Sequence, residues 1–88
     1  MTWKIEFAPS VEKDLRRLGR PARIRVMKFL QDRIARLDDP RSLGQALGGE
    51  WSGYWRYRAG DYRIIAKIVD DRLSIWIVRV AHRREVYR

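Results

Sequence analysis

The first half of the chain changes from a two-residue hydrophobic period to a helical one. Residues 3–7, WKIEF, alternate apolar and polar side chains, which is typical of a strand with one buried face. Pro9 ends this strand, and Gly19 suits the end of a helix. Between them, three apolar side chains recur at the spacing of one helix face: Val11, Leu15 and Leu18. The pattern predicts a strand followed by a helix.

A second helix is predicted to follow after a very short turn. Pro21 suits the first turn of a helix, and Asp38, Asp39 and Pro40 end the helical pattern near Leu37. The residues expected to face the core are Ile24, Met27, Leu30, Ile34 and Leu37, with Val26 and Phe29 beside them. Because the connection is so short, the two helices must fold back on each other as a hairpin.

The second half of the chain contains three strand-like runs. Residues 41–53 hold four glycines and no sustained period, so we expect a connecting loop there. The runs Tyr54–Arg58, Tyr62–Val69 and Leu73–Val80 are rich in β-branched and aromatic residues and are separated by short polar turns. This pattern is typical of consecutive antiparallel hairpins, a β-meander.

The order of these elements predicts a single α+β domain over residues 1–88. The N-terminal strand and the two-helix hairpin should pack on an antiparallel sheet of about four strands, with one sheet face covered by helices and the other free. We expect the first strand to join this sheet after the helical crossover. At 88 residues, the chain has room for one modest core.

The net positive charge of the chain indicates which class of binding partner to expect. The chain carries 20 Lys and Arg against 11 Asp and Glu, a formal net charge of +9. Most of the cations are arginines, whose planar guanidinium suits bidentate contacts with phosphate. We therefore expect a polyanionic partner: nucleic acid, an anionic membrane surface or an acidic protein. A basic surface without a partner is the plain alternative.

Other features of composition point to the cytoplasm. No apolar run approaches the roughly 20 residues of a membrane span, and the N-terminus lacks the apolar core of a signal peptide. The sequence has no cysteine, one histidine, no Gly-rich phosphate loop and no metal-binding cluster. We therefore expect no metal site, no cofactor and no membrane partner.

The predicted strands place cations on one sheet face. Alternation sends Arg56 and Arg58 to one face and Trp55 and Tyr57 to the other. If the strands are neighbours, cations of the later strands and of the C-terminal segment should converge with these two arginines on one surface, with tyrosines available as aromatic contacts: Arg63, Lys67, Arg79, His82, Arg83, Arg84, Arg88, Tyr54, Tyr62 and Tyr87. Cations mixed with aromatic rings are what a single-stranded nucleic acid requires, because phosphates need neutralising and bases need stacking partners.

These residues also have structural interpretations. Arg56 and Arg58 are equally explained as solvated residues of an exposed sheet face. Arg63 lies within an apolar strand, where an unpaired charge is costly, so it needs a partner or a function. The tryptophans of the predicted strands are interpreted as packing residues: Trp3, Trp55 and Trp76.

Three segments resemble a known family. WRYRAGDYRIIAKIVDD (residues 55–71) and VRVAHRREVYR (residues 78–88) closely resemble the RelE-type toxins of bacterial and archaeal toxin–antitoxin modules. WKIEFAPSVEKDLRRLG (residues 3–19) is similar to that family's opening strand and first helix. The resemblance spans nearly the whole chain. It implies the family's fold, a small sheet carrying an N-terminal helical hairpin.

The resemblance also implies an activity: cleavage of mRNA in the ribosomal decoding site without a metal ion. In such cleavage the RNA 2′-hydroxyl attacks the adjacent phosphate, so the enzyme must align the attack, move two protons and stabilise charge on the phosphate. By position in the motif, Arg63 and Arg83 match the family's phosphate-stabilising arginines, and Tyr87 matches its C-terminal tyrosine. Arg56 falls where some members have a catalytic lysine.

The chain departs from the family pattern at the strand lysines. Tyr54 and Arg56 stand where some members carry two lysines, and Arg56 is a poor general base because arginine stays protonated at neutral pH. Histidine is the side-chain type whose unperturbed pKa falls near neutrality, and related toxins place a catalytic histidine in the region of His82. We therefore interpret the catalytic set, with His82 as proton carrier and the general base left open, as Arg56, Arg63, His82, Arg83 and Tyr87.

Two partners are implied by the resemblance. One is a mostly acidic antitoxin protein, docked on the helical hairpin and a sheet edge in a toxin–antitoxin hetero-oligomer. The other is the ribosome with mRNA in the 30S decoding site, where the predicted RNA contacts are Tyr54, Arg58, Lys67, Arg79 and Arg84. Two alternatives stay open: a ParE-type toxin that inhibits DNA gyrase by protein binding, and a non-catalytic nucleic-acid-binding domain. The terminal set of His82, Arg83 and Tyr87 favours the nuclease.

Overall fold

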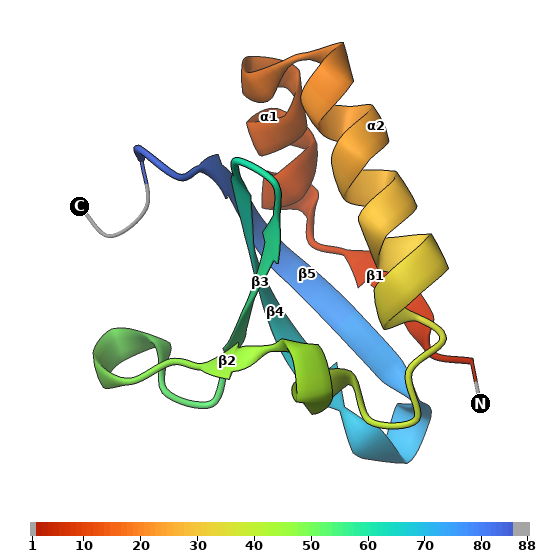
Figure 1. The fold of residues 1–88 in the computed structure, drawn as a ribbon. Helices are drawn as coiled ribbons and strands as arrows, with labels where there is room; N and C mark the ends of the chain where they lie inside the picture. Colours follow the sequence, from red (N-terminus) through yellow and green to blue (C-terminus); the bar gives the residue numbers. More distant parts are fainter. Residues whose placement is uncertain (1, 86–88) are drawn as a thin grey trace.

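A mixed five-stranded sheet in the order β1-β5-β4-β3-β2 forms the centre of the fold (Figure 1). The computed structural model describes residues 2–85. The strands are β1 (Lys4–Phe7), β2 (Gln45–Ala46), β3 (Trp55–Ala59), β4 (Tyr62–Val69) and β5 (Ser74–His82). The predicted meander is confirmed, because β3, β4 and β5 pair in sequence as antiparallel neighbours.

The sheet differs from the prediction in its two edge strands. β1 joins the sheet after the helical crossover, as expected, but it pairs parallel with β5, so the sheet is mixed. At the other edge, the expected loop over residues 41–53 contains the two-residue strand β2, which pairs antiparallel with β3. The sheet therefore has five strands, where about four antiparallel strands were predicted.

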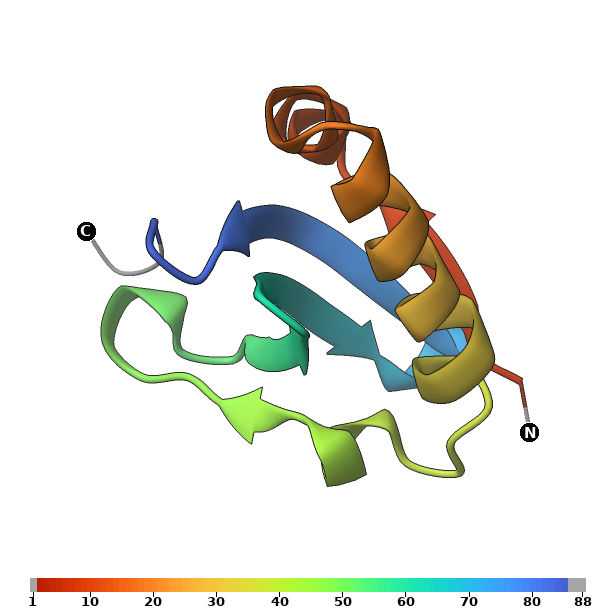
Figure 2. The same cartoon turned by 45° about the horizontal axis from the view of Figure 1, so that its top comes forward.

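Two helices cover one face of this sheet. Helix α1 (Pro9–Leu18) and helix α2 (Arg20–Phe29) are joined at Gly19, whose φ of 94° lies in the left-handed region that favours glycine. Figures 1 and 2 show both helices on the same side of the sheet, and Figure 2 shows the β2 segment lying away from them. The face opposite the helices is therefore left without a covering layer in residues 2–85.

The predicted buried line of the second helix was wrong at its start. Ile24 is 57% exposed, and the fully buried positions of α2 are Ala22 and Val26. The following turn, Leu30–Ile34, is a π-helix whose wider winding keeps Leu30 and Ile34 on the same buried line. The helix thus turns a different face to the sheet, and Ile24 lies on its outer side.

The core lies between the helices and the sheet. Tyr57 of β3 is fully buried there, and its hydroxyl donates a hydrogen bond to the Pro40 carbonyl at 2.7 Å. Burial raises the pKa of the Tyr57 hydroxyl well above its ordinary value. Gly44 lies directly beneath this ring, since a Cβ there would meet Tyr57 at 3.1 Å. The long connection between α2 and β3 is therefore fastened to the core rather than loose.

Candidate functional site

The sheet face opposite the helices carries a cluster of arginines, which we call the arginine face. In β3, Tyr57 points into the core, so Arg56 and Arg58 point to the opposite side. Arg58 pairs directly with Arg63 of β4. Ile65 of β4 pairs with Arg56 of β3 on one side and with Arg79 of β5 on the other. Directly paired residues point to one face. The structure thus brings these four predicted cations together on three adjacent strands.

A bulge in β5 places Arg79 on the arginine face. Ile65 of β4 pairs with Arg79, whereas the next residue, Ala66, pairs with Ile77. Val78 is therefore an extra residue that shifts the alternation by one. Without it, Arg79 would point to the same side as Ile77, which is fully buried in the core.

Helix α1 holds both sides of this bulge. The Ser10 hydroxyl donates to the Val78 carbonyl at 3.2 Å, and the Asp14 carboxylate accepts the backbone N–H of Val80 at 3.0 Å. These contacts satisfy backbone groups that an interrupted strand ladder leaves unpaired. The bulge is thus a defined feature of the α1–β5 packing.

The turn between β3 and β4 contacts two arginines, Arg63 of the arginine face and Arg83. Arg63 donates from Nη1 to the carbonyls of Gly60 at 3.0 Å and Tyr62 at 3.2 Å. The backbone N–H of Arg83 donates to the Asp61 carbonyl at 2.7 Å, and its guanidinium Nε lies 3.7 Å from the Asp61 carboxylate. Arg63 has structural partners, and Arg83 is fastened next to it at the end of β5.

His82 lies on the other side of the sheet. It pairs directly with Tyr62, and the two rings meet edge to face with centroids 5.9 Å apart. Tyr62 packs against the core, so the His82 ring points to the helix side. Its Nδ1 accepts the backbone N–H of Arg84 at 3.2 Å, which leaves Nε2 to carry the proton of the neutral ring. The expectation that His82 and Tyr62 join the arginines on one face was therefore wrong, because the register places both rings on the helix side.

Glu85 closes the turn that follows β5. Its carboxylate accepts the backbone N–H of His82 at 3.1 Å and also the guanidinium of Arg17 from α1. The His82 donor, and after it the charge of Arg17, hold the pKa of Glu85 below its ordinary value. Glu85 is thus an ionised acceptor within a strongly basic segment.

The remaining predicted RNA contacts are spread around the arginine face. Lys67 is exposed on it and pairs directly with Trp76 of β5, which is 44% exposed. The interpretation of Trp76 as a packing residue was wrong, although its alternation with the buried Ile75 and Ile77 carried the signal. Tyr54 precedes β3 and makes an edge contact with the Trp51 ring.

Two predicted residues remain, one at the end of the described chain and one beyond it. Arg84 is exposed in the turn after β5, and Tyr87 lies outside the described residues. Within residues 2–85, no three His, Cys, Asp or Glu side chains gather closely enough to hold a metal ion. The same part of the chain has no helix long and apolar enough to cross a membrane.

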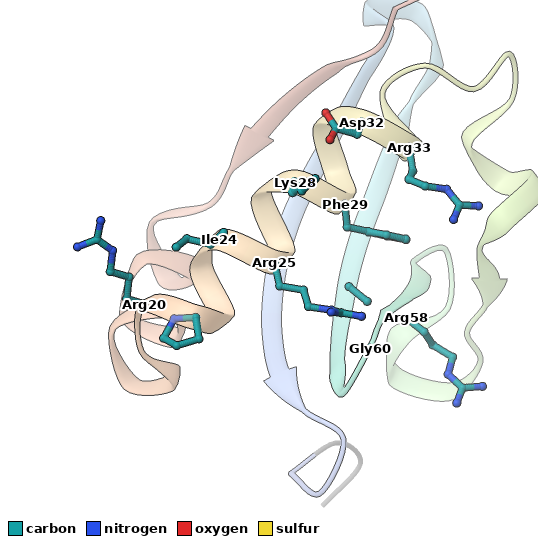
Figure 3. Close-up of a pocket in the computed structure, with 11 residues that line it drawn as sticks. Arg20, Ile24, Arg25, Lys28, Phe29, Asp32, Arg33, Arg58 and Gly60 are labelled. Carbon is teal, nitrogen blue, oxygen red and sulfur yellow. The ribbon is translucent and has the colours of Figure 1, made fainter.

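A second basic surface lies on the outer side of α2. A groove of about 1070 Å³ runs between this helix and the β3–β4 turn (Figure 3). Its apolar lining is Pro21, Ile24, Phe29 and Ala59, and its charged lining is five cations and one acid: Arg20, Arg25, Lys28, Arg33, Arg58 and Asp32. Figure 3 shows Arg25 reaching from α2 toward Gly60. A Cβ added at Gly60 would lie 2.7 Å from Nε of Arg25, so the guanidinium occupies the space that a larger residue would need. The sequence prediction missed this α2 groove because it assigned Ile24 to the core.

Comparison with known proteins gives consistent matches over nearly the whole chain. Residues 5–87 match the family model described as the ParE toxin of the type II toxin–antitoxin system parDE. The toxin RelG of Mycobacterium tuberculosis is 30% identical over 88 residues, covering 100% of this chain and 99% of that protein. The toxin–antitoxin complex RelBE2 of the same organism superposes with a TM-score of 0.86 at 27% identity, covering 97% and 95% of the two chains. A RelB–RelE antitoxin–toxin complex from Methanococcus jannaschii gives a TM-score of 0.63 at 27% identity, covering 93% and 94%.

Proposed function

Since this chain belongs to the RelE/ParE superfamily of type II toxin–antitoxin toxins, we propose that it is a RelE-like endoribonuclease that cleaves mRNA on the ribosome. The observation that carries the proposal is the arginine face, with four arginines on three adjacent strands and Arg83 fastened at its end. Cations held on a rigid sheet suit a reaction that builds negative charge on a phosphate.

The proposed reaction uses the nucleophile of the RNA itself. The 2′-oxygen forms a bond to the adjacent phosphorus, and the bond from phosphorus to the 5′-oxygen of the next nucleotide breaks, leaving a 2′,3′-cyclic phosphate. The 2′-hydroxyl loses one proton, and the leaving oxygen gains another. In this proposal Arg63 and Arg83 stabilise the transition-state charge, while Arg56 binds the phosphate and cannot act as the base.

Proton transfer to the leaving oxygen is proposed for His82, with Tyr87 beside it. What supports His82 is the ability of an imidazole to donate and accept a proton, and its position next to Arg83. Because its ring packs on Tyr62, on the helix side of the sheet, the RNA must reach it around the end of β5. A competing role is structural, since Nδ1 accepts the N–H of Arg84.

Substrate RNA is proposed to extend across the arginine face from the arginines toward Lys67 and Trp76. An exposed indole beside a lysine offers a stacking surface and a phosphate contact. Tyr54 and Arg84 are proposed to contact the RNA beyond these residues. The proposed target places the protein in the cytoplasm.

The antitoxin partner is proposed to dock in the α2 groove. The structural relatives RelBE2 and RelB–RelE are toxin–antitoxin complexes. The apolar floor and basic rim of the groove are complementary to an acidic amphipathic segment. One cation, Arg58, belongs to both the groove and the arginine face, so a segment bound in the groove would also compete with RNA there.

A second candidate function is favoured by the wording of the family match, which describes a ParE toxin. In that case the protein would inhibit DNA gyrase by binding it. Primer extension on ribosome-bound mRNA, together with a supercoiling assay on purified gyrase, separates the two. Cuts within codons support the nuclease, whereas intact mRNA with inhibited gyrase supports the ParE-type activity.

A further inference from the structure

Three hydrogen bonds close the turn over residues 82–85. The N–H of Glu85 donates to the His82 carbonyl at 2.8 Å, and the N–H of His82 donates back to the Glu85 carboxylate at 3.1 Å. The N–H of Arg84 donates to Nδ1 of His82 at 3.2 Å. The Glu85 carboxylate therefore accepts one of the three hydrogen bonds that shape the turn carrying His82 and Arg83.

The second carboxylate oxygen of Glu85 joins this turn to α1. It accepts the guanidinium of Arg17, a residue 68 positions earlier in the sequence. Arg17 lies 3.9 Å from Asp14, the residue that holds the β5 bulge through the N–H of Val80. Helix α1 thus contacts β5 and its following turn at successive points, and the Arg17–Glu85 ion pair is the last of them.

We infer that Glu85, oriented by Arg17, is a positioning residue that fixes the turn carrying His82 and Arg83 at the end of β5, beside the arginine face. The inference rests on the proposed nuclease function. It deepens that function by adding Arg17 and Glu85, two residues that act through His82 and Arg83 rather than on the RNA itself. It also explains why an acid stands in a segment whose other charges are positive.

The Arg17–Glu85 ion pair acts by positioning the turn rather than by stabilising the fold, because the pair is exposed. Arg17 and Glu85 are 47% and 39% exposed, and exposed ion pairs add little to the stability of a fold. The described contacts of Arg83 are its backbone bond to Asp61 and a 3.7 Å approach to the Asp61 carboxylate. A turn held at so few points opens locally at low free energy. Loss of the Arg17–Glu85 contact therefore moves the Arg83 guanidinium without unfolding the sheet.

The test compares four full-length variants in single-turnover cleavage of ribosome-bound mRNA: Glu85→Ala, Glu85→Gln, Arg17→Ala and Arg16→Ala. Arg16 is the matched control, because it is the neighbouring cation on α1, is 77% exposed and pairs at 3.9 Å only within its helix with Glu12. Removing it takes away the same charge without touching the turn.

We expect Glu85→Ala to lower the rate constant at saturation by about tenfold, with the half-saturating concentration changed less than about twofold. Glu85→Gln keeps an acceptor for the His82 N–H and should recover part of the rate. Arg17→Ala should lose about threefold, and Arg16→Ala should match the wild type within about twofold. Equal losses for the two arginine variants would mean that lost charge, rather than position, is responsible.

A second measurement does not depend on activity. Hydrogen exchange at the His82 amide, followed by NMR in the free toxin, should speed up by about tenfold in Glu85→Ala and stay unchanged in Arg16→Ala. Unchanged exchange and an unchanged cleavage rate in Glu85→Ala overturn the inference and leave the nuclease intact. A wild-type protein that leaves ribosome-bound mRNA uncut overturns the proposed function, and exchange at His82 still decides whether Glu85 holds the turn.

Discussion

The arginine face and the α2 groove are both strongly basic, but their surroundings differ. On the arginine face the cations stand on neighbouring strands and are fixed by pairing within the sheet. In the groove the cations stand around apolar side chains, of which Ile24 is 57% exposed. Positive charge alone suits any polyanion, so what lies between the cations distinguishes a surface for phosphates from one for an amphipathic protein segment.

The largest effect should come from Arg63, at the centre of the arginine face. Arg63→Ala is expected to lower cleavage of ribosome-bound mRNA by about 10²–10³-fold, because a preorganised cation that stabilises transition-state charge is lost. Arg63→Lys keeps the charge without the planar guanidinium and should recover only part of the rate. Antitoxin affinity should change less than about threefold in both variants. A loss of antitoxin binding as large as the loss of cleavage would remove the distinction between the two surfaces.

Two substitutions at His82 separate its chemical role from its structural one. If His82 carries a proton in the reaction, His82→Ala and His82→Asn should both lower the cleavage rate by about 10²-fold. Asparagine offers an oxygen near the position of Nδ1, so it can still accept the N–H of Arg84. Recovery of activity in His82→Asn would assign the residue to the turn instead of proton transfer.

The α2 groove is tested by placing a charge on its apolar floor. Ile24→Glu should weaken binding of the cognate antitoxin about tenfold or more, since an apolar anchor is replaced by an acid facing an acidic partner. Leu43→Glu is the matched control, an exposed leucine (43%) outside the groove. Calorimetric titration of the antitoxin measures both affinities. Equal effects of the two substitutions would exclude the groove as the docking site.

The smallest predicted effect concerns salt. Replacing Lys67 by Ala should reduce the slope of log affinity against log salt for ribosome-bound mRNA by about one, because one phosphate contact is lost. Replacing Lys28 by Ala removes the same charge from the groove and should leave that slope unchanged. A filter-binding series at several salt concentrations gives both slopes, and similar changes would show that RNA covers both surfaces.

Alternation along the strands was sufficient to predict most of the arginine face. The sequence YWRYR already separated Arg56 and Arg58 from Tyr57, and the short turns fixed the order of the three strands. The local pattern is reliable there because one side of each strand must be buried. The parallel pairing of β1 and the two-residue strand β2 could not be predicted, since both depend on contacts between distant segments.

The bulge at Val78 explains why alternation alone could not place Arg79 and His82. Strict alternation from the buried Ile77 would put Arg79 on the helix side and His82 on the free face. One extra residue reverses both, and the contacts that hold it come from Ser10 and Asp14 of α1. No local signal in the β5 sequence reports a bulge whose partners are more than 60 residues away.

The central claim is that the arginine face supports attack by the RNA 2′-hydroxyl on the adjacent phosphate. Its most direct test is single-turnover cleavage of two ribosome-bound mRNAs that differ only at the nucleotide before the scissile phosphate, ribose in one and 2′-deoxyribose in the other. We predict a cut within the decoding-site codon of the ribose mRNA, with a 2′,3′-cyclic phosphate end, and no cut in the deoxy mRNA. Equal cutting of both mRNAs, or no cut in either, would contradict the claim.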